Sequence, residues 1–290
     1  MDAERTLLHR GGEPSEWASL GLWPVAPAPL GDYASACHAL ASAVGRAAGM
    51  TPGSRVLSLA CGAGAELLLW REAFGAAQVL GVETDAARVR EARHLVAGRR
   101  DAIEVRHGSG TEARALELAP ASFDSVVCVD AAYHLRPRGA FLRAAFDLLR
   151  PGGRLAYTDL LIDAGHGARW KAAVLHASAR ACGLAADDLL APEAHLRRLH
   201  DNGFEQARLH RLDEAVLGGF ARHVRAQEAA FGGLRARASR SQAWRRPALT
   251  ARLIGPCRAA GLGYALISAT RPAQAVGHSS GQASIASAAA

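Results

Sequence analysis

Short apolar runs alternate with helical patterns through the middle of the chain. Runs rich in β-branched and other apolar residues predict five strands, at 55–60, 78–83, 102–106, 123–129 and 153–160. Apolar positions at helical spacing separate these runs and predict four helices, at 65–74, 86–97, about 111–117 and 138–149. Strands that alternate with helices are typical of a parallel sheet covered on both faces. The pattern therefore predicts an α/β domain.

The pattern changes after residue 160. Two more strands are predicted, at 204–212 and 262–270, and helical insertions precede them, at about 163–190 and 213–260. Ahead of the first of these strands, a short helix is expected to begin at Pro192 and to end at Gly203, both favoured positions for these residue types.

The two ends of the chain lack this alternation. Residues 1–32 are rich in Gly, Pro and Trp and form a separate N-terminal segment, which we expect to act as a lid. Asp32 is placed to cap a helix that runs to about Ala48. Residues 271–290 are small and polar, so we expect a disordered tail. The predicted globular domain spans residues 33–270.

Composition narrows the class of protein. In 290 residues, no apolar run is long enough to span a membrane, and the N-terminus lacks the apolar region of a secretory signal. The five scattered cysteines form no CxxC pair, and the histidines lack partners at ligand spacing. We therefore expect a cytoplasmic protein without a metal site. His195 and His200 are expected on the surface.

The net charge of +7 is compatible with a nucleic-acid partner. However, Lys171 is the only lysine, and the densest basic run, Arg235 to Arg246, contains one aromatic residue. We interpret this run as a solvated helix face and expect no nucleic-acid partner.

The strongest local signal is VLSLACGAGAE, residues 56–66. An apolar strand runs into Gly62 and Gly64 and then directly into a helix, so the backbone can turn sharply and approach a ligand closely. A dinucleotide fold would place a third glycine at position 67, where this chain has leucine. Nineteen residues after Gly64, the second strand ends at Glu83, whose carboxylate can accept hydrogen bonds from both hydroxyls of a ribose.

Four blocks in this order, VLSLACGAG, GVE, FDSVVCVDAAYHL and LLRPGGRLAYTDLL, resemble the class I S-adenosylmethionine-dependent methyltransferases. The resemblance covers about residues 33–270 and is strongest to the small-molecule branch, which includes ubiquinone, menaquinone, tocopherol and natural-product sugar methyltransferases. It implies a Rossmann-like sheet of seven mostly parallel strands, in the order 3-2-1-4-5-7-6, with helices on both faces and helical lid insertions. It also implies S-adenosyl-L-methionine as cofactor and C-, O- or N-methylation of a small or lipid-like organic acceptor in secondary or quinone/terpenoid-type metabolism.

The resemblance implies cofactor contacts position by position. Residues of the glycine loop would line the methionine part, Glu83 would bind the ribose, Ser109 lies where an adenine contact is usual, and Asp130 would lie beside the sulfonium. With their neighbours, the predicted cofactor residues are Ala60, Cys61, Gly62, Gly64, Glu83, Thr84, Ser109, Gly110 and Asp130.

Two positions depart from the family's pattern, because an acidic residue is usual at Ser58 and an aspartate at Ser109. Ser58 loses a carboxylate that supports the methionine end of the cofactor. A non-catalytic cofactor-binding scaffold is therefore one alternative function. An NAD-dependent oxidoreductase is disfavoured by Leu67, and a nucleic-acid methyltransferase is disfavoured because DAAY replaces an (N/D)PPY-type block.

His134, just beyond the fourth strand, is the candidate general base. Active sites of open α/β sheets lie at that edge, and an unperturbed histidine pKa near 6.5 suits proton removal at neutral pH. A histidine in this loop also matches sugar- and quinone-methylating relatives. The alternative is that His134 caps the helix starting near Pro137. Tyr133 is expected to contact the substrate or to pack under the cofactor.

Large apolar rings in the lid segments fit an aromatic, terpenoid or acyl substrate, although any single ring can equally serve the core. The predicted substrate-binding rings are Trp17, Trp23, Tyr33 and Trp170, with Phe220, Phe231 and Trp244 from the late insertion.

Overall fold

The computed structural model describes residues 16–25, 29–112, 116–163, 169–181, 189–230 and 242–273. The basic run from Arg235 lies largely outside these residues, as do the side chains of Phe231 and Trp244.

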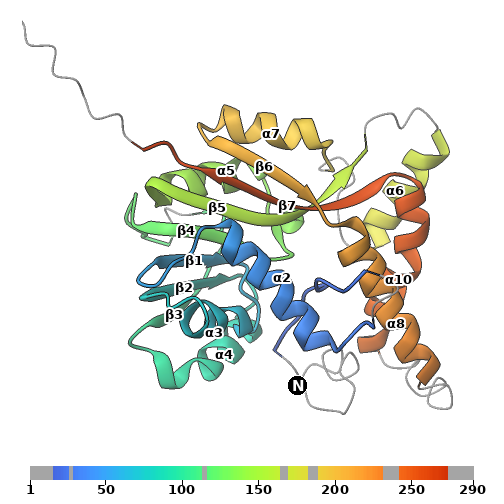
Figure 1. The fold of residues 1–290 in the computed structure, drawn as a ribbon, viewed down its shortest axis with the longest axis horizontal. Coiled ribbons are helices and arrows are strands. Elements are labelled where there is room, and N and C mark those ends of the chain that lie inside the picture. The colour runs from blue at the N-terminus through green and yellow to red at the C-terminus, as the bar shows by residue number, and fades with distance from the viewer. Residues whose placement is uncertain are drawn as a thin grey trace, which may run out of the picture.

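A seven-stranded sheet with the order β3-β2-β1-β4-β5-β7-β6 forms the centre of the molecule, as predicted. Strands β1 to β5 pair in parallel, and β7 runs antiparallel to both β5 and β6 (Figure 1). The strands are β1 Arg55–Leu59, β2 Gln78–Glu83, β3 Ile103–His107, β4 Phe123–Cys128, β5 Leu149–Ile162, β6 Glu205–Arg211 and β7 Leu262–Thr270.

Strand β5 is longer than its apolar run predicts at both ends, because Leu149 already pairs with Phe123 of β4 and the pairing with β7 continues to Ile162 opposite Leu262. The predicted disordered tail also begins too early. The amide of Arg271 donates to the Gly153 carbonyl at 2.9 Å, so this residue continues the strand end. Residues 274–290 lie outside the described part of the chain.

The predicted helices form, with one exception. They are α2 Tyr33–Ala47, α3 Ala65–Glu72, α4 Ala86–Leu95, α5 Arg138–Leu148, α6 Arg169–Ala181, α7 Pro192–Asp201, α8 Gly219–Ala230 and α10 Gln242–Ala259, with short turns η1 Ala97–Arg99, η2 Ala132–His134 and the π-helical η4 Glu214–Gly218. The Asp32 carboxylate caps α2 by accepting from the Ser35 amide at 2.8 Å. The predicted helix at 111–117 is wrong at its described residues, which form turns or irregular backbone.

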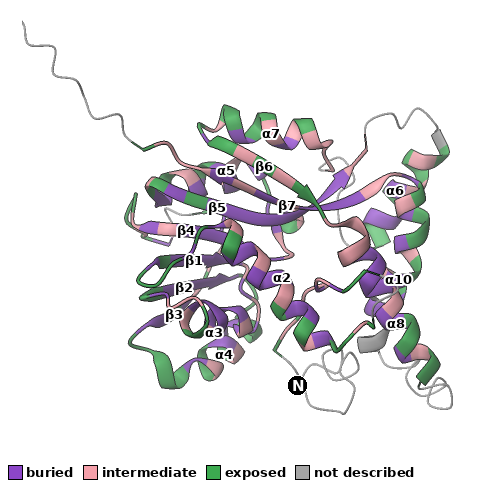
Figure 2. Ribbon diagram, viewed as in Figure 1, coloured by how far each residue is buried: buried purple, intermediate pink, exposed green. Residues whose placement is uncertain are grey.

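Two apolar cores lie on opposite faces of the sheet. Helices α2, α3 and α4 cover one face, where Trp70 is fully buried, and α5 and α7 cover the other, where Phe141 is buried. Figure 2 shows the inner strands of the sheet as mainly buried, whereas the edge strand β6 is mostly exposed or intermediate. Helices α6, α8 and α10 gather beside one end of the strands (Figure 1). Within the described residues, no helix combines the length and apolarity that a membrane span requires.

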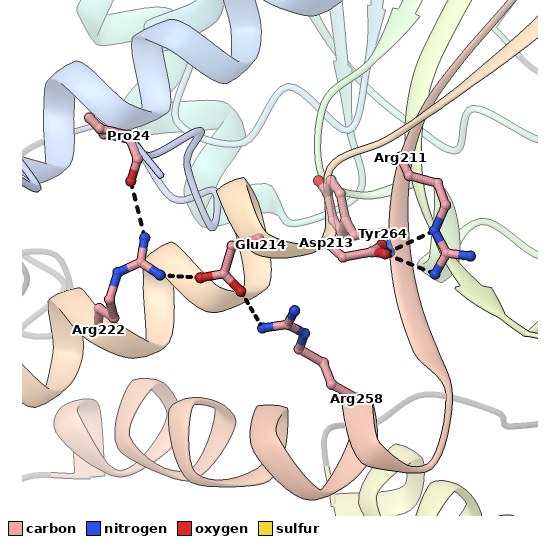
Figure 3. A network of polar contacts seen from close by, with 7 residues as sticks. All are labelled: Pro24, Arg211, Asp213, Glu214, Arg222, Arg258 and Tyr264. Carbon is pink, nitrogen blue, oxygen red and sulfur yellow. Dashed lines mark hydrogen bonds and ion pairs between the residues drawn. The ribbon is translucent and has the colours of Figure 1, made fainter. Parts of the chain in front are cut away.

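Polar contacts attach η4, α8 and α10 to the sheet and to the N-terminal segment (Figure 3). Glu214 of η4 pairs with Arg222 of α8 and with Arg258 of α10, the latter at 2.7 Å. Arg222 also donates to the Pro24 carbonyl at 3.0 Å. Asp213 accepts from the Tyr264 amide of β7 at 2.7 Å. The network therefore places η4, α8 and α10 in a defined position over the sheet's end.

Candidate active site

A cavity of about 490 Å³ opens at the carboxyl ends of β1, β2 and β4. Most of the residues predicted from the sequence for the cofactor line it together, and Tyr133, His134 and Trp17 join them. Those cofactor residues are Ala60, Cys61, Gly62, Glu83, Thr84, Ser109, Gly110 and Asp130.

Glu83 is a buried carboxylate in the cavity wall, with 6% of the residue exposed. Its Oε1 accepts from the amides of Thr84 and Asp85 at 2.8 and 2.9 Å, and its Oε2 accepts from the Gly62 amide at 2.9 Å. A carboxylate offers about four acceptor positions, so Oε2 retains capacity for a ligand hydroxyl. Glu83 therefore joins the glycine loop to the end of β2, beside the cavity.

The two glycines of the loop serve different purposes. Gly62 lines the cavity, with φ 57°. Gly64 is not among the lining residues and caps α3 with φ 93°. A Cβ at Gly64 would lie 3.0 Å from the Ala92 Cβ, so this glycine permits the close approach of α3 and α4. Ala60 also lines the cavity and has a left-handed φ of 57°, which is strained for a residue with a Cβ.

Asp130 connects three parts of the chain. Its Oδ2 accepts from the Leu20 amide at 2.5 Å, and its Oδ1 accepts from the hydroxyls of Tyr264 and Tyr133 at 2.6 and 3.0 Å. Its own amide donates to Thr158 Oγ1 at 2.7 Å. Burial raises the pKa of this carboxyl to about 6, although these hydrogen bonds partly offset the rise. Asp130 therefore fixes the N-terminal segment and Tyr133 at the sheet's edge.

His134 ends the short helix η2 and lines the cavity. Burial lowers the pKa of its imidazole, and the positive charges of Arg136, Arg138 and Arg88 lower it further. The ring is therefore neutral at pH 7 and can accept a proton. The alternative role as a helix cap is wrong, because Pro137 caps α5 and no side chain bonds to its first amides.

A second cavity, of about 280 Å³, adjoins the first. Both are lined by Ala18, Asp130, Tyr133 and His134. The remaining lining residues of the second cavity are mainly aliphatic and come from the insertion helices and nearby segments. They are Leu20, Leu160, Leu175, Ser178, Ala179, Leu189, Leu217, Thr250, Leu253, Ile254, Cys257 and Leu262.

Most of the rings predicted for the substrate do not reach either cavity. Trp17 lines the first cavity, whereas Trp23 and Tyr33 are each 2% exposed and belong to the core. Both support the N-terminal segment, because the Trp23 indole donates to the Leu20 carbonyl and the Tyr33 hydroxyl to the Ser19 carbonyl, each at 2.7 Å. Trp170 is 57% exposed and lines neither cavity. Phe220 is buried in the core.

The expectation that His195 lies on the surface is wrong, because only 3% of it is exposed. Its Nδ1 lies 4.0 Å from the buried carboxylate of Asp159, which pairs with Arg138. Burial, followed by the charge of Arg138, lowers the pKa of the imidazole to about 4. Arg138 of α5, Asp159 of β5 and His195 of α7 thus form a buried cluster, and none of them lines either cavity. His200 is exposed, as expected.

Sequence reasoning also missed three groups at the site. Leu20 and Tyr264 lie 110 and 134 residues from Asp130 along the chain, so no local pattern could connect them. Glu66, in the first turn of α3, lines the first cavity and lies beside Ser58. Its position in the helix was visible in the sequence, but its direction was not.

The comparisons with known proteins agree with this geometry. Residues 56–153 match a family model described as a methyltransferase domain. Geranyl diphosphate C-methyltransferase from Streptomyces coelicolor A3(2), solved with Mg²⁺, geranyl diphosphate and S-adenosyl-L-homocysteine, has the same fold, with a TM-score of 0.67 at 17% identity over 88% of this chain and 91% of that chain. With the sheet order, these matches show a methyltransferase domain that has the fold of class I S-adenosylmethionine-dependent methyltransferases, and the relatives below are methyltransferases of small molecules.

The chain is also similar to two curated methyltransferases. The chain is 27% identical to erythromycin 3''-O-methyltransferase of Saccharopolyspora erythraea, over 72% of this chain and 68% of that protein. It is 33% identical to 27-O-demethylrifamycin SV methyltransferase of Amycolatopsis mediterranei, over 40% of this chain and 43% of that protein. The predicted family, enzyme class and cofactor are confirmed.

Proposed function

We propose that this methyltransferase methylates a hydroxyl group on a large apolar scaffold of natural-product type. The observation that carries this proposal is that a mixed polar cavity and an aliphatic cavity meet at Asp130, Tyr133 and His134. In this proposal the larger cavity holds S-adenosylmethionine, and the aliphatic one holds the acceptor. Two relatives named as acting on erythromycin and on 27-O-demethylrifamycin SV support an acceptor of this kind.

The residues of the larger cavity fit the cofactor. Its volume of about 490 Å³ lies in the usual range for small-molecule sites. The Glu83 carboxylate can accept from ribose hydroxyls, and Ser109 with Gly110 lies where the adenine would be bound, past the end of β3. Ala60, Cys61 and Gly62 would contact the methionine part. When bound, the cofactor supplies an electrophilic methyl group on sulfur.

The N-terminal segment acts as a cover over this site in our proposal. Glu16, Trp17, Ala18 and Ser19 line the larger cavity, and the Leu20 amide bonds to Asp130. These contacts support a cover formed by residues 16–20 over the cofactor cavity. A closed site excludes water and favours transfer to the acceptor over hydrolysis.

His134 acts as the general base in this proposal. The acceptor oxygen forms a bond to the methyl carbon while the carbon–sulfur bond breaks, and the hydroxyl proton passes to the imidazole. Because burial and nearby arginines lower the pKa of His134, its neutral form is present at pH 7. Tyr133 positions the loop, since its hydroxyl donates to Asp130 at 3.0 Å.

Acceptor screening tests the proposal. Purified protein and S-adenosylmethionine are incubated with 27-O-demethylrifamycin SV, an erythromycin-type acceptor with a free 3''-hydroxyl, simple terpenoid and aromatic alcohols, sarcosine, and a short RNA. We expect S-adenosylhomocysteine to form with an apolar alcohol. Turnover with sarcosine or RNA alone would exclude this acceptor class.

Two variants assign the cavities. Ala179→Phe fills the aliphatic cavity, so it should raise the acceptor KM at least tenfold and leave S-adenosylhomocysteine binding unchanged. His134→Ala should lower kcat about a hundredfold with little change in cofactor affinity, as a positioned base typically contributes. Near-normal kcat in His134→Ala, with a lower melting temperature, would make this histidine structural.

A further inference from the structure

Glu66 is a buried carboxyl in the wall of the larger cavity that no step described above uses. It stands in the first turn of α3, with only 8% of the residue exposed, and it lines the cavity beside Ala65. A carboxyl this deeply buried is costly to ionise unless a cation or several donors compensate it. Its surroundings therefore indicate what kind of group belongs beside it.

One carboxylate oxygen of Glu66 is held by a hydrogen bond from the sheet. Oε1 accepts from the Ser58 hydroxyl of β1, and the Trp70 indole Nε1 donates to that Ser58 oxygen at 3.4 Å. The other oxygen, Oε2, makes no hydrogen bond with the described residues and is not completely buried. Oε2 is therefore the oxygen that is accessible from the cavity.

No cation of the described chain pairs with Glu66. The charged and titratable groups that face it are the Glu83 carboxylate of β2 and the thiols of Cys61 and Cys128, and Arg88 of α4 lines the same cavity without an ion pair to it. Burial raises the pKa of Glu66 to about 8, and the negative charge of Glu83 adds to the rise. At neutral pH the side chain is mostly protonated until a positive group enters the cavity.

We propose that Glu66 binds the α-ammonium group of the cofactor's methionine part, with Oε2 accepting from it and Ser58 holding Oε1. The inference rests on the proposed placement of the cofactor in this cavity. Ribose hydroxyls belong at Glu83, and the reacting methyl group must face the junction with the second cavity at Asp130. The amino-acid end therefore extends along the glycine loop, where Glu66 is the buried acid. An ammonium can donate a hydrogen bond, which a sulfonium cannot.

The pairing of Ser58 with Glu66 explains how this chain can manage without the acidic residue that is usual at position 58. The strand offers a hydroxyl there, and the helix supplies the carboxyl that the hydroxyl orients. The negative charge thus comes from α3 instead of β1. Ser58 acts as a positioning residue for Glu66.

Binding of two ligands to Glu66→Gln tests the proposal. S-adenosylhomocysteine carries the α-ammonium, whereas 5'-methylthioadenosine has the same nucleoside and thioether without the amino-acid part. Glu66→Gln should weaken S-adenosylhomocysteine binding about tenfold to a hundredfold, the range for a charged hydrogen bond, and leave methylthioadenosine binding unchanged. Unchanged methylthioadenosine binding also shows that the variant is folded. Glu72→Gln, at an exposed position of the same helix, is the matched control and should change neither affinity.

Proton release gives a second readout. Because the pKa of Glu66 is about 8, pairing with an ammonium at pH 7 should release close to one proton, and Glu66→Gln should release correspondingly less. Isothermal titration in two buffers of different ionisation enthalpy measures this difference.

The possible outcomes separate this inference from the proposed site. If wild type binds both ligands and Glu66→Gln binds S-adenosylhomocysteine normally, the inference is overturned and the site stands. A loss confined to S-adenosylmethionine would assign Glu66 to the sulfonium and also overturn it. If wild type binds neither ligand, the cofactor site itself fails.

Discussion

Replacing Glu83 perturbs the cofactor site at the contact that joins two of its loops. The carboxylate accepts three backbone amides, two in its own turn and one across the cavity wall from Gly62. Glu83→Ala removes the bond to Gly62 together with the bonds that we propose to the ribose. Charged hydrogen bonds contribute about 1.5–3 kcal/mol each, so the loss of one or two in a water-accessible cavity should weaken binding by about 1–3 kcal/mol. This loss corresponds to a Kd increase of about 5- to 150-fold.

Glu83→Gln tests the same role of the carboxylate with a side chain of the same shape. Amides approach both carboxylate oxygens, so the glutamine NH₂ must face either the Gly62 amide or the amides of Thr84 and Asp85. Donor would then face donor, and this isosteric change should weaken binding about as much as alanine does. Isothermal titration with S-adenosylhomocysteine measures the affinity, and urea unfolding measures stability.

Asp85→Ala is the control for Glu83, because it removes the cap of α4 without touching the cavity. It should lower stability and leave cofactor affinity unchanged. Wild-type affinity in Glu83→Gln would refute the assigned role of this carboxylate.

Three further predictions concern stability and the lid. The pKa of His195 is lowered from 6.5 to about 4, so the unfolded chain binds more protons than the folded one between these pH values. The free energy of unfolding should therefore fall by about 3 kcal/mol as the pH drops through this window. Urea unfolding of His195→Gln should lack this decrease, and a pH profile identical to that of wild type would contradict the assignment. Ala60→Gly should raise unfolding stability by up to about 1 kcal/mol, because glycine relieves the left-handed φ of 57°; a lower urea midpoint would show that no strain is stored there. Trp170→Ala should leave the acceptor KM unchanged, because the ring is exposed and lines neither cavity, and a raised KM would restore it to the substrate site.

The sequence was sufficient for the sheet and for one wall of the site. Apolar runs located all seven strands, because strands and the glycine turns at their ends are encoded by neighbouring residues. The order of the strands came from the family resemblance. The contacts of Asp130 with Leu20 and Tyr264 could not be predicted, since they depend on how distant segments meet. Residue type also could not separate Trp17, which lines a cavity, from Trp23, which is buried in the core.

The aliphatic cavity was beyond prediction for a related reason. Its wall combines residues from segments far apart in the sequence, mainly three from α6 and four from α10, with others from the N-terminal segment, β5 and η4. Helical periodicity identifies the apolar face of each helix, but it does not say whether that face meets another helix or a ligand.

The position of β7 in the sheet has a consequence for how the protein is made. This strand follows all the others in the sequence, yet it lies between β5 and β6 and supplies Tyr264 to the Asp130 cluster. A ribosome releases the chain from its N-terminus, so the parallel half of the sheet can form during translation while β5 and β6 wait with unpaired edges. The edges of β5 and β6 therefore stay open to pairing with other chains until β7 emerges, and Asp130 gains its hydrogen bond from Tyr264 only when that strand is inserted.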